Sequence, residues 1–88
     1  MLTPDTPCVI IYAINLEMDR LIKFCVEAGI DFYFISSNNL LLIESEYLNT
    51  VKLMYEGKFI TSVEQPLKVF IDWEGPVKDI SFKKLDIY

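Results

Sequence analysis

The chain has 88 residues, of which 52% are hydrophobic, and it carries a formal net charge of −5 with no histidine. This length supports one hydrophobic core, so we expect a single domain over residues 1–88, with a core over 8–74 and a C-terminal strand or arm over 75–88. The charge would repel phosphate groups and excludes nucleic acid as an expected partner. The absence of a signal-like start or an apolar run of about 20 residues predicts a cytoplasmic protein with no membrane partner.

The first strand and the first helix have the clearest patterns. Residues 8–14 (CVIIYAI) are a continuous apolar run rich in β-branched residues, which predicts a strand buried on both faces. Apolar residues then recur at helical spacing over 16–28, with Asn15 as the expected N-cap. Gly29 is placed where a left-handed residue commonly ends a helix.

A hairpin is expected next. Residues 31–36 (DFYFIS) are aromatic and strand-like, and residues 40–44 form the expected returning strand. Asn38 and Asn39 lie between them and tolerate the positive φ of a tight turn.

A shorter amphipathic helix and another strand follow the hairpin. Ser45 is the expected N-cap of a helix over 47–55, and Gly57 is expected to close it. Residues 59–63 have the composition of a strand, which Pro66 is expected to end.

The last part of the sequence also alternates like a strand. Residues 67–73 (LKVFIDW) predict an additional strand or the true last strand of the sheet, and Gly75-Pro76 predicts a turn. Residues 80–87 alternate with a change of phase at Lys83-Lys84, which predicts an edge strand with a bulge.

The order strand, helix, strand, strand, helix, strand resembles the βαββαβ plan of ferredoxin-like domains. The resemblance covers roughly residues 8–64 and rests on element order, not on a motif. It implies an α+β fold in which an antiparallel sheet carries two helices on one face, here with an additional C-terminal strand or hairpin.

The side chains that usually carry catalysis or bind metals are sparse. Histidine is absent, and Cys8 and Cys25 lack the spacing and the partners of a zinc site. Two cysteines in a reducing compartment are expected to be free thiols, with a structural disulfide as the alternative. We therefore expect no catalytic residue, no metal and no cofactor, and no enzymatic activity.

Two pairs of acidic residues could in principle place two carboxylates on one surface. They are Glu44 with Glu46 and Asp72 with Glu74. Residues two apart on a strand share a face, which is the arrangement that acid/base catalysis would need. Acids at edge strands and helix starts more commonly keep those surfaces solvated, and this is the interpretation we adopt.

Two families with the same order of elements bind ligands. Residues 11–16 (IYAINL) resemble the first-strand motif of RNA-recognition domains, with Tyr12 at the stacking position, but residues 40–43 lack the aromatic side chains of the companion motif. The element order is also similar to that of ACT-type domains, which implies a small molecule bound between paired subunits. The loop after the first strand lacks the glycine usual in that family.

Both faces of the predicted sheet are apolar. In the first strand Ile11 alternates with Ile10 and Tyr12, and the hairpin strands behave in the same way. Two helices can cover one face, and an exposed apolar face would exceed what a soluble monomer usually tolerates. The second face must therefore be covered by residues 67–88, by another protein or by a second copy of the chain.

These observations favour a small acidic protein that binds another protein as a regulator or inhibitor, or that forms a homodimer. Such a chain would suit a bacteriophage or mobile-element protein that blocks a host factor. The alternatives are an ACT-like small-molecule sensor and an acidic mimic of nucleic acid. The expected partner-binding residues are aromatic or acidic and comprise Tyr12, Tyr33, Phe70, Asp72, Trp73, Glu74 and Phe82.

Overall fold

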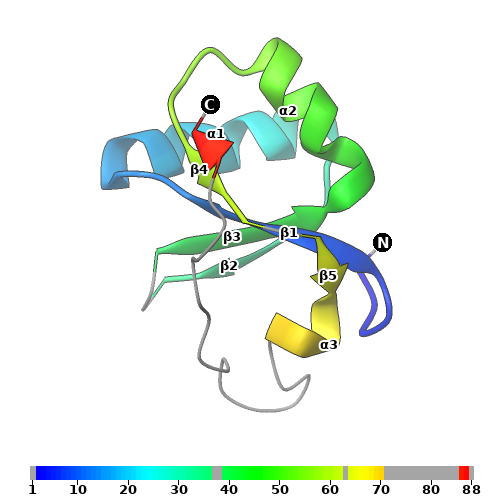
Figure 1. Ribbon diagram of the computed structural model, residues 1–88. Helices are drawn as coiled ribbons and strands as arrows, with labels where there is room; N and C mark the ends of the chain where they lie inside the picture. The colour runs from blue at the N-terminus through cyan, green and yellow to red at the C-terminus, as the bar shows by residue number, and fades with distance from the viewer. Residues whose placement is uncertain (1, 37–38, 63, 71–85, 88) are drawn as a thin grey trace.

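The computed structural model describes residues 2–36, 39–62, 64–70 and 86–87 (Figure 1). Its strands are β1 (Pro7–Tyr12), β2 (Phe32–Ile35), β3 (Leu40–Glu44), β4 (Ile60–Thr61), β5 (Gln65–Pro66) and β6 (Asp86–Ile87). Its helices are α1 (Asn15–Ala28), the 3₁₀ helix η1 (Ser45–Tyr47), α2 (Leu48–Met54) and α3 (Leu67–Phe70).

All the described strands belong to one antiparallel sheet. Its order is β2-β3-β1-β4-β6, and β5 pairs with the beginning of β1. The predicted α+β class is confirmed. In the part of the chain that the structure describes, the sheet has six strands. A βαββαβ plan requires four, and β5 and β6 are additional, so that plan does not describe the sheet completely.

Helix α1 begins one residue earlier than expected. Ile14 is the N-cap residue, with extended backbone, and its carbonyl oxygen accepts the Met18 N–H at 2.8 Å. Asn15 is therefore the first helical residue, and its predicted capping role is wrong. At the other end Gly29 has φ 72°, and the Ile30 N–H donates to the Cys25 carbonyl at 2.8 Å, which confirms the left-handed C-cap.

Replacing Gly29 with alanine should lower the free energy of unfolding by about 1–2 kcal/mol, because an L-residue is strained at this positive φ. No atom lies within 4 Å of the position that the new Cβ would occupy, so the cost should be conformational only. Gly29→Asn should cost less, since asparagine tolerates this conformation. Urea unfolding measures both changes, and equal losses for the two variants would contradict the explanation.

The hairpin has the predicted strands, and Asn39 is the described residue of the predicted turn. Asn39 has φ 54°, and its side-chain amide donates to the Ala13 carbonyl at 2.6 Å. The second helical region differs from expectation. Ser45 opens η1 without a side-chain capping bond, and α2 ends with Tyr55 in an extended conformation, so neither Ser45 nor Gly57 has the capping role predicted for it.

Helices α1 and α2 cover one face of the sheet (Figure 1). The core on this side, which we call the helix-side core, is built around buried strand residues that include Val9, Ile11, Leu41 and Ile43. Met18, Leu21 and Cys25 of α1 and Val51 of α2 pack against them, with Tyr55 and Phe59. The expected helical face of α1 is confirmed.

The opposite face of the sheet is also apolar, as the alternation predicted. Its buried residues, which we call the second-face core, are Cys8, Ile10, Ile35, Leu40, Leu42, Leu67 and Phe70, with Leu2 packed against them. Leu67 and Phe70 belong to α3, which lies on the side of the sheet away from α1 and α2 (Figure 1). The chain itself therefore covers part of its second face.

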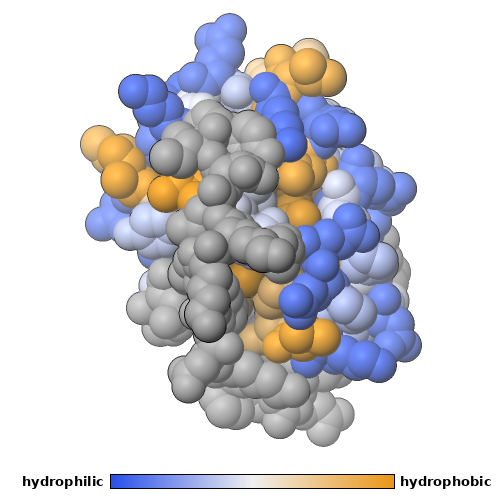
Figure 2. Space-filling view, viewed as in Figure 1, coloured by the Kyte–Doolittle hydropathy of each residue, from blue (hydrophilic) through white to orange (hydrophobic). Residues whose placement is uncertain are grey.

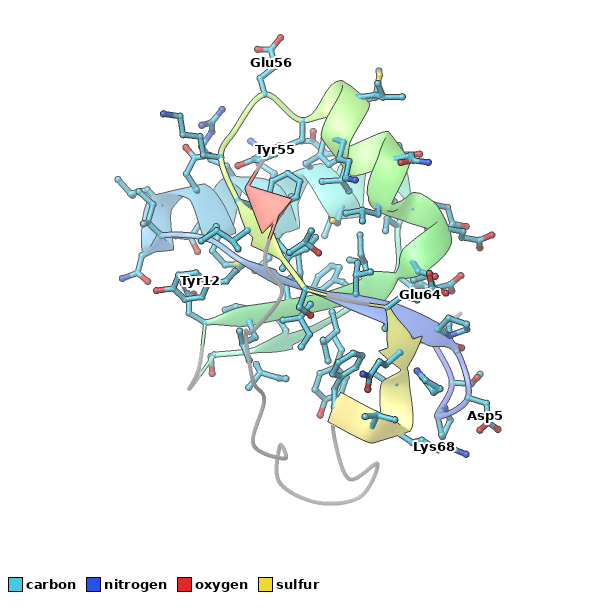
Figure 3. All side chains as sticks on the ribbon, viewed as in Figure 1. Asp5, Tyr12, Tyr55, Glu56, Glu64 and Lys68 are labelled. Carbon is cyan, nitrogen blue, oxygen red and sulfur yellow. The ribbon has the colours of Figure 1, made fainter. Side chains whose placement is uncertain are left out.

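Helix α3 is attached to the N-terminal segment. The Leu67 N–H donates to the Thr6 carbonyl at 2.8 Å, and the Lys68 N–H donates to the Pro4 carbonyl at 2.9 Å. The Lys68 Nζ lies 2.9 Å from the Asp5 Oδ1, and Figure 3 shows these side chains together at the edge of the molecule. Backbone groups at the start of α3 thereby find partners that the helix itself cannot supply.

The strand predicted over 67–73 is wrong for residues 67–70. Leu67 and Phe70 lie one helical turn apart and are buried together, whereas Val69 is 45% exposed. Residues 71–73 lie outside the described residues, as does the predicted turn at 75–76.

The strand predicted over 59–63 is shorter than expected. Only Ile60 and Thr61 form β4, and β5 includes Pro66, where the sequence predicts an end of strand structure. Proline fits there because Pro66 lies opposite Pro7 at the end of the ladder. The predicted edge strand is confirmed at residues 86–87, while the bulge at 83–84 lies outside the described residues.

Candidate functional site

A groove of about 500 Å³ lies where β1 passes into α1, opposite the segment that joins α2 to β4. Its lining residues are Tyr12, Ala13, Ile14, Glu17, Arg20, Glu56, Gly57, Lys58, Phe59 and Ile60. The volume is in the range of pockets that bind small molecules or single side chains of a partner. One wall is apolar, and charged side chains lie toward α1 and the 56–58 segment.

Two exposed apolar side chains line one side of the groove, Tyr12 with 41% exposure and Ile14 with 68%. Leu16, which is 76% exposed, follows in the first turn of α1, and we call these three residues the β1–α1 ridge. Figure 2 shows hydrophobic surface at the left of the molecule, over the start of α1, and Figure 3 shows Tyr12 projecting on the same side. Large apolar side chains that gather on a surface commonly mark an interaction site.

A polar network formed by Glu17 holds the opposite side of the groove together. Its Oε2 accepts hydrogen bonds from the Tyr55 hydroxyl at 2.7 Å and from the Lys58 N–H at 3.3 Å. Its Oε1 accepts a hydrogen bond from Arg20 Nη1 at 2.6 Å. The Arg20 guanidinium also lies 5.8 Å from the centre of the Tyr55 ring. One carboxylate thus ties the first turn of α1 to the segment after α2.

These contacts shift the acidity of both partners. The hydrogen bond from Tyr55 is the main reason that the pKa of Glu17 is lowered, and Arg20 lowers it further. Burial, followed by the hydrogen bond to Glu17, raises the pKa of Tyr55 to about 12. At neutral pH the pair is therefore an ionised carboxylate and a neutral phenol, which acts as the donor.

Acidification should destabilise the protein through Glu17. Its pKa is lower in the folded than in the unfolded chain, so its contribution to stability is present above the unfolded value of about 4.3 and is lost as the pH falls through the folded pKa. The melting temperature of Glu17→Gln should therefore depend less on pH than that of the wild type below pH of about 4.5. Parallel pH profiles for the two proteins would contradict this assignment.

Gly57 permits the close approach of this network. A Cβ at this position would overlap the Glu17 carboxylate and the Tyr55 ring. The backbone of Gly57 therefore lies where no other residue fits without a shift of its neighbours, which is the usual reason for glycine beside a packed polar group.

The three predicted partner-binding residues that the structure describes lie in different places. Tyr12 borders the groove, whereas Tyr33 is 39% exposed on β2, at the edge of the sheet. Phe70 is only 5% exposed and belongs to the second-face core. The other predicted residues lie outside the described residues and comprise Asp72, Trp73, Glu74 and Phe82.

The other residues of the groove and of the ridge were not predicted from the sequence. Leu16 gives a local signal, because it lies off the side of α1 that buries Met18 and Leu21 and so has no place in the core. The role of Gly57 could not be found in this way, since it depends on Glu17, which is far away along the chain.

Glu44 and Glu46 do contact each other. Glu44 is buried, with 8% exposure, and its hydrogen bond to Glu46 is the main reason that the pKa of Glu46 is raised. The predicted role of keeping an exposed surface solvated is therefore wrong for Glu44. Across the ladder, Glu44 faces Cys8, and burial together with this carboxylate raises the pKa of Cys8 to about 11.

Both cysteines are free and buried, as expected. Burial raises the pKa of Cys25 to about 11, so neither thiol has the low pKa of a reactive cysteine. Cys8 belongs to the second-face core and Cys25 to the helix-side core, so the sheet separates them.

Within the described ranges, no group of three or more acidic or cysteine residues has an arrangement suited to a metal ion. The described helices include none that is long and apolar enough to cross a membrane. Known protein families, curated proteins and solved structures contain no match to this chain.

Proposed function

We propose that this protein is a non-enzymatic regulator or inhibitor that acts in the cytoplasm by binding another protein, and that it docks through the β1–α1 ridge and the adjoining groove. The observation that carries this proposal is the exposure of Tyr12 and Ile14 in the lining of a concave surface, with exposed Leu16 following in the first turn of α1. Covering such side chains would contribute roughly 25 cal/mol for each Å² of apolar surface removed from water.

The proposed partner presents an apolar side chain within a positively charged surface. An aliphatic or aromatic group would enter the groove between Ile14 and Phe59. The net charge of −5 would favour the approach of a basic protein over an acidic one.

The ridge replaces the second face as the proposed docking surface. The apolar alternation of the strands predicted a cover over that face, which could be residues 67–88, another protein or a second copy of the chain. Helix α3 and Leu2 now cover its centre, where Ile10 and Leu42 are at most 1% exposed. The need for an external cover therefore does not arise at these residues.

We also propose a ferredoxin-like plan for the central part of the fold, to which β5, α3 and β6 are additions. The antiparallel order β2-β3-β1-β4 and the position of α1 and α2 on one face support this proposal. A shared fold does not by itself indicate a shared function, so the proposed function depends on the groove and the ridge.

A small-molecule sensor is the second candidate function. It is favoured by the volume of the groove and by its position after the first strand, where the resemblance to ACT-type domains implies a ligand. A metabolite that raises the melting temperature of the wild type, but not of a groove variant such as Ile14→Ser, would support this candidate over protein binding.

The ridge can be tested with matched neutral substitutions. The ridge variant is Ile14→Ser with Leu16→Gln, and the control is Val26→Gln with Leu53→Gln, which changes two similarly exposed apolar side chains on the helices. Ser at position 14 should also cap α1, so the ridge variant should remain folded.

Immobilised wild type is used to capture proteins from the organism that encodes the chain, and each captured protein is purified and titrated by calorimetry. The proposal predicts a partner whose affinity falls by roughly 100-fold or more for the ridge variant and stays within about 3-fold for the control. Equal binding by the wild type and the ridge variant would refute the ridge as the docking surface. Salt-sensitive binding confined to DNA-binding proteins would instead support mimicry of nucleic acid.

A further inference from the structure

Strand β2 forms one edge of the sheet and lacks the usual protection of an edge strand. It pairs with β3, and no described strand lies on its other side. Its sequence, Phe-Tyr-Phe-Ile, contains no charged residue and no proline, which are the common devices against pairing with another chain. Tyr33 is 39% exposed and Phe34 is 36% exposed.

The hydrogen-bond pattern of the sheet shows toward which neighbouring strand each residue of β1 directs its backbone N–H and C=O groups. The Ser62 N–H donates to the Ile10 carbonyl at 3.0 Å, so the backbone groups of Ile10 are directed toward the β4 side. In an antiparallel sheet, consecutive residues direct their N–H and C=O groups to opposite sides. The backbone groups of Ile11 therefore point toward β3, where the partner of Ile11 in the register is Leu41.

The same alternation continues through β3 to the edge. The backbone N–H and C=O groups of Leu41 point toward β1, so those of Leu42 point toward β2, where Tyr33 is the partner of Leu42 in the register. Tyr33 therefore bonds to β3. Its neighbours Phe32 and Phe34 direct their N–H and C=O groups outward, to the open edge of the sheet.

The open edge is complementary to itself. The sequence Phe32-Tyr33-Phe34 is the same in both directions, so two antiparallel copies can meet at Tyr33 with identical residues on either side of the centre. In this register each outward-facing N–H of β2 meets a C=O of the second copy, and each outward-facing C=O meets an N–H. We propose that β2 binds β2 of a second copy of this chain, about a two-fold axis at Tyr33, to form a homodimer with a continuous sheet.

This register fixes the contacts across the axis. Phe32 exchanges both N–H···O=C bonds with Phe34 of the partner subunit, and the symmetric pair does the same. Tyr33 faces Tyr33 of the partner subunit in a non-hydrogen-bonded pair, where the side chains approach closely and aromatic rings stabilise the pairing. The two-fold contact is closed, so assembly at this edge stops at a dimer.

The dimer does not depend on the β1–α1 ridge and is tested separately. Light scattering after size-exclusion chromatography, over a range of loading concentrations, should show a monomer–dimer equilibrium with a dissociation constant on the order of 100 µM, because the interface is small. A wild-type protein that remains monomeric at millimolar concentration would overturn the proposal.

Tyr33→Lys separates this edge from other routes to a dimer. It places two positive charges opposite each other at the axis and should abolish the dimer, although it makes the acidic chain less negative. Leu53→Lys makes the same charge change at an 82%-exposed site on α2 and should leave the dimer intact. Equal dimerisation by the two variants would refute the proposed interface, provided that both melt as the wild type does.

Amide hydrogen exchange of the wild type reports the register directly. The Phe32 and Phe34 amides should exchange fast in dilute solution and slowly where the dimer forms, whereas the Tyr33 amide should be protected at both concentrations because it bonds to β3. Fast exchange at Phe34 in a sample that is fully dimeric would place the interface elsewhere. The result is independent of whether any other protein binds the ridge.

Discussion

Replacing Leu67 with alanine should lower the free energy of unfolding by about 2–5 kcal/mol, the range for a large buried aliphatic side chain. Leu67 is fully buried and packs with Phe70 against the second-face core. The loss would be a large part of the total stability, which for a domain is about 5–15 kcal/mol. Urea unfolding followed by circular dichroism measures the change.

Val69→Ala is the matched control for Leu67→Ala. Val69 lies in the same short helix but is 45% exposed, so its replacement should cost no more than about 0.5 kcal/mol. Leu67→Met should also be tolerated, since it conserves most of the volume. If Leu67→Ala were as mild as Val69→Ala, α3 would not pack on the sheet, and the second face would again need an external cover.

Replacing Gly57 with alanine should lower the free energy of unfolding by about 1–3 kcal/mol, as is typical when a group is forced into a packed site. The new methyl group would collide with the Glu17 carboxylate and the Tyr55 ring. Chemical unfolding measures the loss, and NMR titration of Glu17 should show its pKa moving back up as the hydrogen bond from Tyr55 is broken.

A double-mutant cycle tests the cause of the Gly57 effect. In a Glu17→Ala background, part of the collision is removed, so Gly57→Ala should cost less than it does in the wild type. Additive losses would mean that the two residues do not interact. A neutral effect of Gly57→Ala in the wild type would show that the 55–58 segment moves away at little cost.

Local patterns predicted the parts of the fold that depend on neighbouring residues. Helix α1 follows from apolar spacing, and its end follows from Gly29, whose positive φ needs no distant partner. The burial of β1 on both faces follows from its continuous apolar sequence. The positive φ of Asn39 similarly follows from the turn that joins two strong strands.

Residues 67–70 could not be predicted in this way because two periodicities fit so short a segment. The alternation of Leu67 and Val69 indicates a strand, but the burial of Leu67 with Phe70 has helical spacing. Backbone bonds from α3 to the carbonyls of Pro4 and Thr6 favour the helix, and such distant partners are not visible in a local pattern.

The candidate site was predicted only at Tyr12. Its exposed neighbours Ile14 and Leu16 resemble ordinary strand and helix residues when each pattern is considered alone. The groove forms because β1, α1 and the 56–60 segment meet, so its polar side depends on contacts between residues far apart in sequence.

The attachment of α3 to the N-terminal segment has a consequence for biosynthesis. The second face of the sheet is covered only after Leu67 and Phe70 have been synthesised. The backbone bonds that hold α3 there use the carbonyls of Pro4 and Thr6, which are synthesised first. Until then Ile10 and Leu42 form an exposed apolar surface on a sheet that also still lacks β6. A nascent chain paused before this point should therefore recruit chaperones, and its release should coincide with docking of α3.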